Sequence, residues 1–211
     1  MSEYGYIPEA PEQSFGNNKG IFTPKDIYDL TRADKYTNYG QLELIETVEI
    51  DNTINFYDFD NLGNYNVHFV TANNLKVSST TAQNLDIRFK VGGEQVFASY
   101  QFAQQLGNSA GTFSESKSTS FSQAVWLPNL DNETNASANG YCYIYNAIDS
   151  SKFTFTTFHT VVKQDVHTPR FTFGSNVYAV ASECSGFRFF NAVDGNLSSG
   201  SISLYGIKEY S

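Results

Sequence analysis

The chain has 211 residues, of which 16% are aromatic and 17% are charged, and its net charge at pH 7 is −9. An acidic protein repels phosphate backbones and anionic lipid surfaces, which excludes nucleic acid as an expected partner and argues against a membrane surface. We find no apolar run near the roughly 20 residues of a spanning helix and no signal peptide in residues 1–10, so we expect no membrane insertion.

The first predicted segment is an extended arm over residues 1–20. This segment contains Pro8, Pro11 and several Gly and Asn residues, and it has no apolar period. Because a free terminal segment of this kind is ordered only when it packs on something, we expect the arm to lie on a neighbouring subunit. We expect residues 21–40 to form a short helix and a connection, and residues 41–211 to form one domain.

A helix start follows the arm. Thr23 can cap the helix, Pro24 suits the first helical position, and Asp26 favours the positive N-terminus. We expect this helix to end near Lys35. The predicted assembly interface consists of apolar residues of the arm and of the helix: Phe15, Ile21, Phe22, Ile27 and Leu30.

From residue 41 onward the apolar period changes to two, which is typical of strands. The clearest strand covers residues 85–91, where apolar and charged residues alternate, so we expect one buried and one solvated face. Gly92 and Gly93 can provide the positive φ of a tight turn, and residues 96–102 are the expected returning strand. The other expected strands cover residues 42–48, 54–59, 65–72, 120–127, 141–148, 153–162, 171–173, 177–181, 187–190 and 201–207.

Many short strands separated by turn clusters predict an all-β fold. The expected architecture is an antiparallel two-sheet sandwich or jelly roll, preceded by the extended arm and one short helix. A domain of this size buries a real core without disulfides or metals. We therefore expect Cys142 and Cys184 to be semi-buried thiols on strands.

No pattern in the sequence points to catalysis. The three histidines, His68, His159 and His167, have no second His or Cys at metal spacing, and we expect structural roles for them. Asp58 and Asp60 point the same way from a strand and are weak candidates for a metal site, although acidic turns are usually solvated. We expect a non-enzymatic protein without catalytic residues and without cofactors.

Two features are candidates for recognition. Residues 127–140 form a polar, Asn-rich loop, which is typical either of recognition or of a variable surface loop. The tyrosines of residues 141–145 share one strand face, which suits a sugar-stacking platform, a buried core or a subunit interface, and we favour the last two. The candidate recognition residues are Asn129, Asp131, Asn132, Asn135, Asn139, Tyr141 and Tyr143.

The two ends of the domain resemble known proteins. Residues 20–30 read GIFTPKDIYDL and residues 40–47 read GQLELIET, while residues 186–190 read GFRFF and residues 199–208 read SGSISLYGIK. These segments resemble β-sandwich virion structural proteins of tailed bacteriophages, especially phages of marine bacteria. The resemblance is specific only at these ends, and it supplies no catalytic residues.

The resemblance implies a virion structural protein that is made in the host cytoplasm. Its implied partners are other virion proteins and further copies of itself, as a homotrimer or another symmetric homo-oligomer. The first hypothesis is a tail-fibre or tail-associated component that contacts the host surface, and the alternative is a capsid decoration protein. A further alternative is a lectin-like module that binds host surface glycans through tyrosines and Asn-rich loops.

Overall fold

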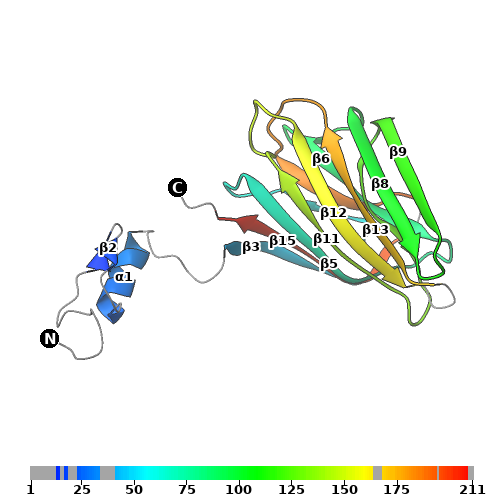
Figure 1. The fold of residues 1–211 in the computed structure, drawn as a ribbon, viewed down its shortest axis with the longest axis horizontal. Helices are drawn as coiled ribbons and strands as arrows, with labels where there is room; N and C mark the ends of the chain where they lie inside the picture. Colours follow the sequence, from blue (N-terminus) through cyan, green and yellow to red (C-terminus); the bar gives the residue numbers. More distant parts are fainter. Residues whose placement is uncertain are drawn as a thin grey trace. The chain divides into compact units, whose positions relative to one another are not determined.

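Two compact units, residues 1–41 and residues 42–211, make up the chain. The structure, a computed structural model, describes residues 13–14, 17–18, 23–33, 41–163, 168–193 and 195–208 (Figure 1). In the first unit the two-residue strands β1 (Gln13–Ser14) and β2 (Asn17–Asn18) pair antiparallel, and α1 (Pro24–Arg32) follows.

The N-terminus of α1 has the predicted cap. The Thr23 hydroxyl accepts a hydrogen bond from the backbone N–H of Asp26 at 3.2 Å, and the Asp26 carboxylate accepts one from the backbone N–H of Thr23 at 2.8 Å. Pro24 occupies the first turn, where it lacks only an N–H that no helical carbonyl would have bonded. The helix ends at Arg32, with Ala33 as its C-cap, instead of continuing to Lys35 as expected.

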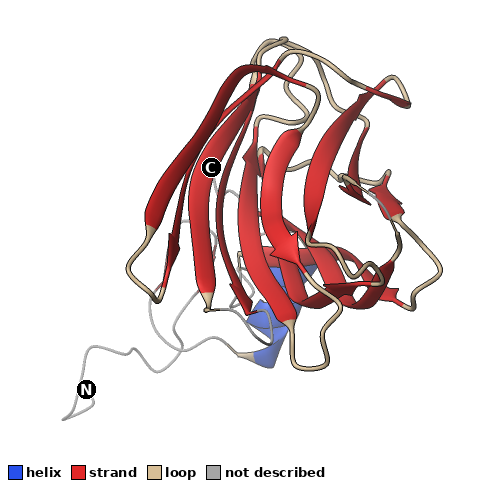
Figure 2. Cartoon of the chain, turned by 90° about the vertical axis from the view of Figure 1, so that its right-hand side faces the viewer, coloured by secondary structure: helices blue, strands red, loops and turns tan. Residues whose placement is uncertain are grey.

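The second unit is the predicted all-β sandwich of two antiparallel sheets (Figure 2). The larger sheet has eight strands in the order β3 (Leu42–Ile50), β15 (Leu197–Ile207), β5 (Val67–Val77), β11 (Ser137–Tyr145), β12 (Thr154–Lys163), β13 (Arg170–Tyr178), β8 (Tyr100–Asn108) and β9 (Phe113–Phe121). The smaller sheet has the order β10 (Ala124–Leu130), β6 (Gln83–Val91), β14 (Gly186–Asn191) and β4 (Phe56–Phe59), and β7 (Glu94–Gln95) pairs with β6.

An aromatic core fills the space between the two sheets. The Phe189 ring makes edge contacts with Phe59 and Trp126, at centroid distances of 5.6 and 5.2 Å. Phe89 and Phe187 pack in the same way at 5.7 Å, and all five side chains are at most 1% exposed. These rings line the inner side of the smaller sheet, and Phe89 also contacts Tyr100 and Tyr178 of the larger sheet, at 5.7 and 6.0 Å between centroids. Rings of this size dominate the apolar area that a core removes from water, so such contacts hold the sheets together.

The turn after strand β6 agrees with the prediction, whereas the exposure of the strand's charged face does not. Gly92 and Gly93 have φ of 60° and 87°, as the predicted tight turn requires. The charged face of β6 is not solvated, however, because Asp86 and Lys90 are only 3% and 8% exposed. After the turn β7 and the backbone N–H of Val96 pair with β6, but residues 100–102 begin β8 in the larger sheet, so the single returning strand expected at residues 96–102 is wrong.

Three other segments differ from the prediction. The two strands expected at residues 171–173 and 177–181 form one continuous strand, β13. Residues 113–121 form β9, which was not predicted because its Ser-rich sequence has no apolar alternation. The loop expected over residues 127–140 is shorter than predicted, since β10 runs to Leu130 and β11 begins at Ser137. Hydrogen bonds to neighbouring strands override weak local propensity in the last two segments, because strand formation depends mainly on the partner strand.

Candidate functional site

The outer face of the eight-stranded sheet, turned away from the core, is aromatic and partly exposed. Strand β12 shows the pattern clearly: Thr156 and Phe158 point inward and are buried, while Phe155, Thr157 and His159 point outward and are exposed. Successive side chains of a strand point to opposite faces, so the register of the sheet determines which outward residues are neighbours.

Three rows of outward side chains cross this face. The central row contains the paired residues Leu44, Tyr205, Phe69, Tyr143, Thr157, Ser175, Ala103 and Lys117, from β3 to β9. The row on one side contains Ile207, Val67, Tyr145, Phe155, Val177 and Gln101. The row on the other side contains Ser203, Thr71, Tyr141, His159, Phe173, Gln105 and Glu115.

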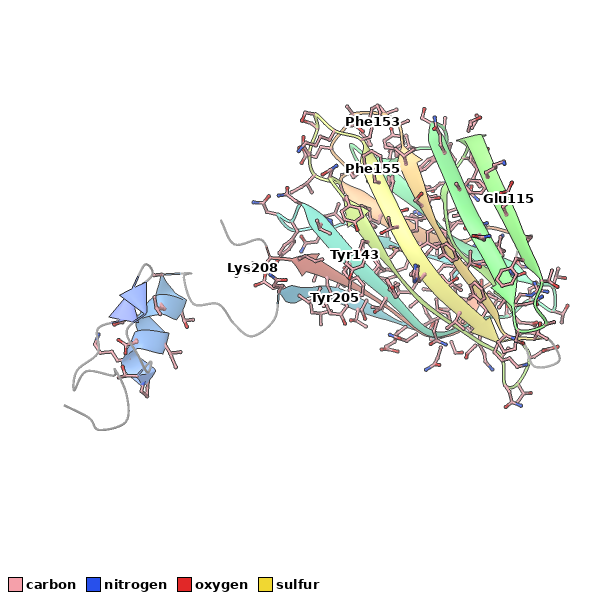
Figure 3. The ribbon with its side chains drawn as sticks, viewed as in Figure 1. Glu115, Tyr143, Phe153, Phe155, Tyr205 and Lys208 are labelled. Carbon is pink, nitrogen blue, oxygen red and sulfur yellow. The ribbon has the colours of Figure 1, made fainter. Side chains whose placement is uncertain are left out.

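The central row has two unlike halves. Over β3, β15, β5 and β11 it consists of large side chains, and we call this half the aromatic ridge: Leu44, Tyr205, Phe69 and Tyr143. Over β12, β13 and β8 it consists of small side chains, and these form the floor of a groove: Thr157, Ser175 and Ala103. Figure 3 labels Tyr205 and Tyr143 of the ridge, and Phe155 beside the groove.

The rings of the ridge pack against one another. The Phe69 ring lies 4.8 Å from the Tyr143 ring and 6.1 Å from the Tyr205 ring, measured between centroids. Tyr141, in the neighbouring row, lies 5.8 Å from Phe69. Contacts at these distances restrict the side-chain rotamers, so the ridge presents a pre-organised surface.

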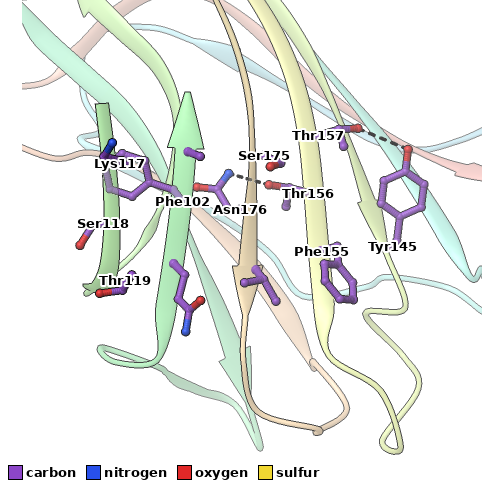
Figure 4. Close-up of a pocket in the computed structure, with 13 residues that line it drawn as sticks. Phe102, Lys117, Ser118, Thr119, Tyr145, Phe155, Thr156, Thr157, Ser175 and Asn176 are labelled. Atoms are coloured by element: carbon purple, nitrogen blue, oxygen red, sulfur yellow. Dashed lines mark hydrogen bonds between the residues drawn. The ribbon is translucent and has the colours of Figure 1, made fainter. Parts of the chain in front are cut away.

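The groove is an open hollow of about 790 Å³ (Figure 4). Tyr145 and Phe155 line this hollow along one side of the floor. Tyr141 and Phe173, on the other side, line a second hollow of about 440 Å³ that also includes Thr157 and Ser175. The Tyr145 hydroxyl lies 3.3 Å from the hydroxyl of Thr157, which ties one border to the floor. A groove with an apolar border and hydroxyl groups on its floor suits another protein surface or the face of a sugar ring.

Charged groups are sparse on this face. In the three rows the charged pair is Lys117 with Glu115, at 2.8 Å near one end of the groove, and both side chains are 72% exposed. Next to the ridge the Tyr141 hydroxyl lies 3.3 Å from Nδ1 of His159. A face with exposed aromatic residues and few charges has the composition of an interface core.

The outer side of the smaller sheet is different, and it contains the two weak metal candidates. Arg188 donates to both carboxylate oxygens of Asp58 at 2.6 Å, and Lys90 donates to Asp58 at 3.2 Å and to Asp60 at 2.6 Å. Burial acts to raise the pKa of Asp58, but the hydrogen bonds from Arg188 and Lys90 outweigh it and hold that pKa below its ordinary value. Two cations therefore already neutralise these carboxylates.

A second polar cluster on this side surrounds Asp86. Its carboxylate accepts from Nε2 of Gln123 at 2.9 Å and from the backbone N–H of Trp126 at 3.3 Å, and Arg88 donates to the same Gln123 side chain at 3.1 Å. Burial raises the pKa of Asp86 to about 6, against the opposing effect of these hydrogen bonds. Across the described part of the chain, no three His, Cys, Asp or Glu side chains gather into a metal-binding group.

The predicted recognition residues do not form one cluster. Asn129, on β10, accepts from Arg170 of β13 at 2.9 Å, and Asn132, in the turn between β10 and β11, donates to the backbone carbonyl of residue 78, just after β5, at 3.4 Å. Asp131 caps the same turn by accepting from the backbone N–H of Asn132, and Asn135 is exposed there. These contacts are structural.

The remaining predicted recognition residues lie on the outer face, on β11. Asn139 accepts from the backbone N–H of Asn74 at 2.9 Å, while Tyr141 and Tyr143 belong to the rows described above. Tyr141 is 38% exposed, which removes the buried-core interpretation of the tyrosines. The interface and sugar-platform interpretations both remain.

The predicted assembly interface belongs to the first unit. Ile27 and Leu30 are half-buried on α1, and none of the α1 side chains is fully buried. Phe15, Ile21 and Phe22 lie outside the described residues, so the role of the arm stays a prediction.

The histidines and cysteines that the structure describes have separate surroundings. His68 is buried and its Nε2 lies 2.8 Å from the Leu62 carbonyl, while burial holds its pKa below the ordinary value. Cys142 and Cys184 are both free and buried, more deeply than expected, and burial raises the pKa of each thiol. Cys142 lies on β11 as expected, but Cys184 lies in the connection between β13 and β14 and not on a strand. A buried protonated thiol is a poor nucleophile, so these cysteines act as core residues. His167 lies outside the described residues.

Sequence reasoning found the strand of β12 but missed that Phe155 and Phe158 point to opposite sides. The available signal was the spacing of three between these two phenylalanines, which cannot place both on one face of a strand.

No helix in the described ranges is long and apolar enough to cross a membrane. Comparisons with models of protein families, with curated proteins and with solved structures gave no match.

Proposed function

We propose that the protein is a non-enzymatic structural component of a tailed bacteriophage particle that works by assembling into a symmetric oligomer. The observation that carries this proposal is the aromatic outer face of the eight-stranded sheet. Leu44 is 60% exposed, Phe173 42% and Phe155 43%, on a face with one charged pair in its three central rows. Contiguous apolar surface of this kind marks an interaction site in a soluble protein.

The segments that resemble phage virion proteins support the same proposal. Residues 186–190 lie in β14, which is flanked by β6 and β4, and residues 199–207 lie in β15, between β3 and β5. These two of the four resembling segments therefore occupy an inner strand of each sheet, while residues 42–47 lie in β3, at the edge of the larger sheet. Tyr205, one of these residues, is part of the aromatic ridge. The tail-associated location is our first proposal, and capsid decoration is the alternative.

The direct test is to find the protein in purified particles. Quantitative mass spectrometry gives its copy number, and gold-labelled antibodies against the sandwich show its position by electron microscopy. A few to a few tens of copies on the tail would support the first proposal, and hundreds of copies on the head would support decoration. Absence of the protein from complete particles would contradict both.

A second candidate function is glycan binding, which the groove favours. Tyr145 and Phe155 border a floor that carries the hydroxyl groups of Thr157 and Ser175. Aromatic faces stack on sugar rings, and hydroxyl groups exchange hydrogen bonds with them. A glycan array with the wild-type protein and with Phe155→Ala tests this function: binding that the substitution abolishes supports it, and no binding to any sugar counts against it.

A further inference from the structure

We propose that two copies of this chain pair through the outer faces of their eight-stranded sheets, with the aromatic ridge of each copy lying in the groove of the other. This inference rests on the proposed function, since it names the partner that the assembling face takes. It requires a surface that is complementary to itself under a two-fold rotation, because the same patch serves both copies in such an interface.

The order of residues along the central row provides this complementarity. The ridge covers the four strands β3, β15, β5 and β11, and the row continues over β12, β13, β8 and β9 as the groove and its charged end. A two-fold axis that runs parallel to the strands, between β11 and β12, exchanges these halves without changing the row. The rotation places β11 opposite β12, and β5 opposite β13, of the second copy.

In the central row, large side chains then meet small ones near the axis, while in the two flanking rows Tyr145 meets Phe155 and Tyr141 meets His159, ring against ring. Tyr143 faces Thr157 of the second copy, and Phe69 faces Ser175. Close packing requires this alternation of large and small residues across facing positions. The Tyr143 hydroxyl also comes within reach of the Thr157 hydroxyl. Twisted sheets pack face to face at about 30° to each other, so the contact is tightest near the axis, where these pairs lie.

The size of the face suits a stable pair. Strands about 4.8 Å apart and outward residues about 6.8 Å apart along each strand give the three rows an area on the order of 800 Å². Specific interfaces bury about 800 Å² on each partner. The exposed charged pair of the three rows, Lys117 with Glu115, lies on β9 at the rim, where charges are tolerated.

The test uses one substitution in the groove and one in the ridge. Ser175→Arg places a long charged side chain on the groove floor, and Phe69→Ser removes the centre of the ridge. Ser150→Arg, at an exposed turn between β11 and β12, is the matched control. We expect sedimentation equilibrium to give twice the 23.5 kDa of one chain for the wild type and for the control. Each substitution occurs twice in a symmetric dimer, so we expect each one to raise the dissociation constant of the dimer on the order of a hundredfold or more.

Mixing the two variants shows whether a variant fails to dimerise because its interface is broken or because it is misfolded. In a mixed pair the intact ridge of Ser175→Arg meets the intact groove of Phe69→Ser, and the shortened ridge leaves space for the arginine. Native mass spectrometry distinguishes the mixed pair by mass, and we expect it to form more strongly than either variant pair. Misfolded variants would not restore each other.

Three results would overturn the inference: a wild-type protein that stays monomeric at high concentration, a trimer, or a dimer that survives both substitutions. A glycan that occupies the groove of a monomeric protein would also overturn it. Failure of the proposed function is a separate result. A monomeric protein that is present in purified particles refutes the pairing alone, and a dimer that is absent from particles refutes the virion role.

Discussion

The outer faces of the two sheets differ in how their side chains are satisfied. On the smaller sheet, Arg188 and Lys90 hold Asp58, and Arg88 stacks on the Phe190 ring at 4.2 Å from its centroid. On the larger sheet, Phe69 and its neighbours contact one another sideways and leave their outer surface open. Contacts within one chain pair the charged groups of the first face, whereas aromatic rings of the second face, such as Phe155 and Phe173, stay partly exposed.

This difference shows that alternation in the sequence does not tell a solvated face from an interaction face. Strand β6 alternates charged with apolar residues, and its charged face is largely buried by partners from its own chain. Strand β12 carries threonine and aromatic residues on both faces, and its aromatic Phe155 is 43% exposed. Apolar side chains are often exposed on proteins, so the size and continuity of the patch distinguish the two cases.

The largest expected effect separates the aromatic face from the core along one strand. Phe158→Ala empties a site in the core that is 1% exposed, and we expect a loss of about 3–5 kcal/mol in the free energy of unfolding. Phe155→Ala, three residues away on the open face, should cost the monomer less than about 1 kcal/mol. Urea unfolding at low protein concentration measures both, and equal losses would show that the outer face stabilises the single chain.

The next effect tests whether the ion pairs on the outer side of the smaller sheet stabilise the single chain. Asp58→Ala leaves Arg188 without its carboxylate and deprives Lys90 of one of two partners, and all three side chains are at most 20% exposed. Breaking an ion pair that is mostly buried costs about 3 kcal/mol, because the remaining charge is desolvated without compensation. Urea unfolding measures the loss, and a value near zero would mean that water replaces the carboxylate.

The buried carboxyl of Asp86 should give a pH dependence of opposite sign to that of exposed acids. Its pKa is about 6 in the folded protein, above the unfolded value of 3.8, so the folded state binds a proton more strongly between these pH values. The stability of the wild type relative to Asp86→Asn should therefore fall by up to about 3 kcal/mol as the pH rises from about 4 to about 7.

Asp149 is the matched control for this pH profile. Hydrogen bonds from Ser151 and Lys152 lower its pKa to about 2, so the stability that it contributes is present above the unfolded pKa and is lost as the pH falls toward about 2. Asp149→Asn should therefore leave the profile between pH 4 and 7 unchanged. If the difference in the free energy of unfolding between the wild type and Asp86→Asn stayed constant across that pH range, burial would not raise the pKa of Asp86.

The smallest effect concerns the charged pair at the rim of the aromatic face. Glu115 and Lys117 are both 72% exposed, and pairs of this kind gain little from each other in water. Glu115→Ala should leave the urea midpoint unchanged, in contrast to Asp58→Ala on the other sheet. A clear destabilisation by Glu115→Ala would show that the two faces are less different than their geometry indicates.

The sequence was sufficient for several local features. Thr23, Pro24 and Asp26 specify the start of α1 because each supplies a group that the first turn requires. Gly92 and Gly93 specify a turn because residues without a Cβ adopt positive φ at little cost. The all-β class followed from the many period-two segments, since only sheets place alternate residues on opposite sides.

The candidate site was only partly predictable. The tyrosines of β11 were identified, but Phe69, Phe173 and Tyr205 join them only through the pairing of distant strands. The carboxylates of Asp58 and Asp60 invited a metal interpretation because Arg188, which holds Asp58, lies 130 residues away in the chain. Neither relation can be read from local spacing.

The sequence by itself therefore determined the class of the fold, the cap of its helix and the position of its tightest turn. These features depend on backbone preferences and on side-chain period, which act over a few residues. Tertiary structure alone decided which face of each strand is buried and how the ridge and the groove align in one row. That outcome depends on strand order and register, because a shift of one residue would turn every side chain of a strand to the other face.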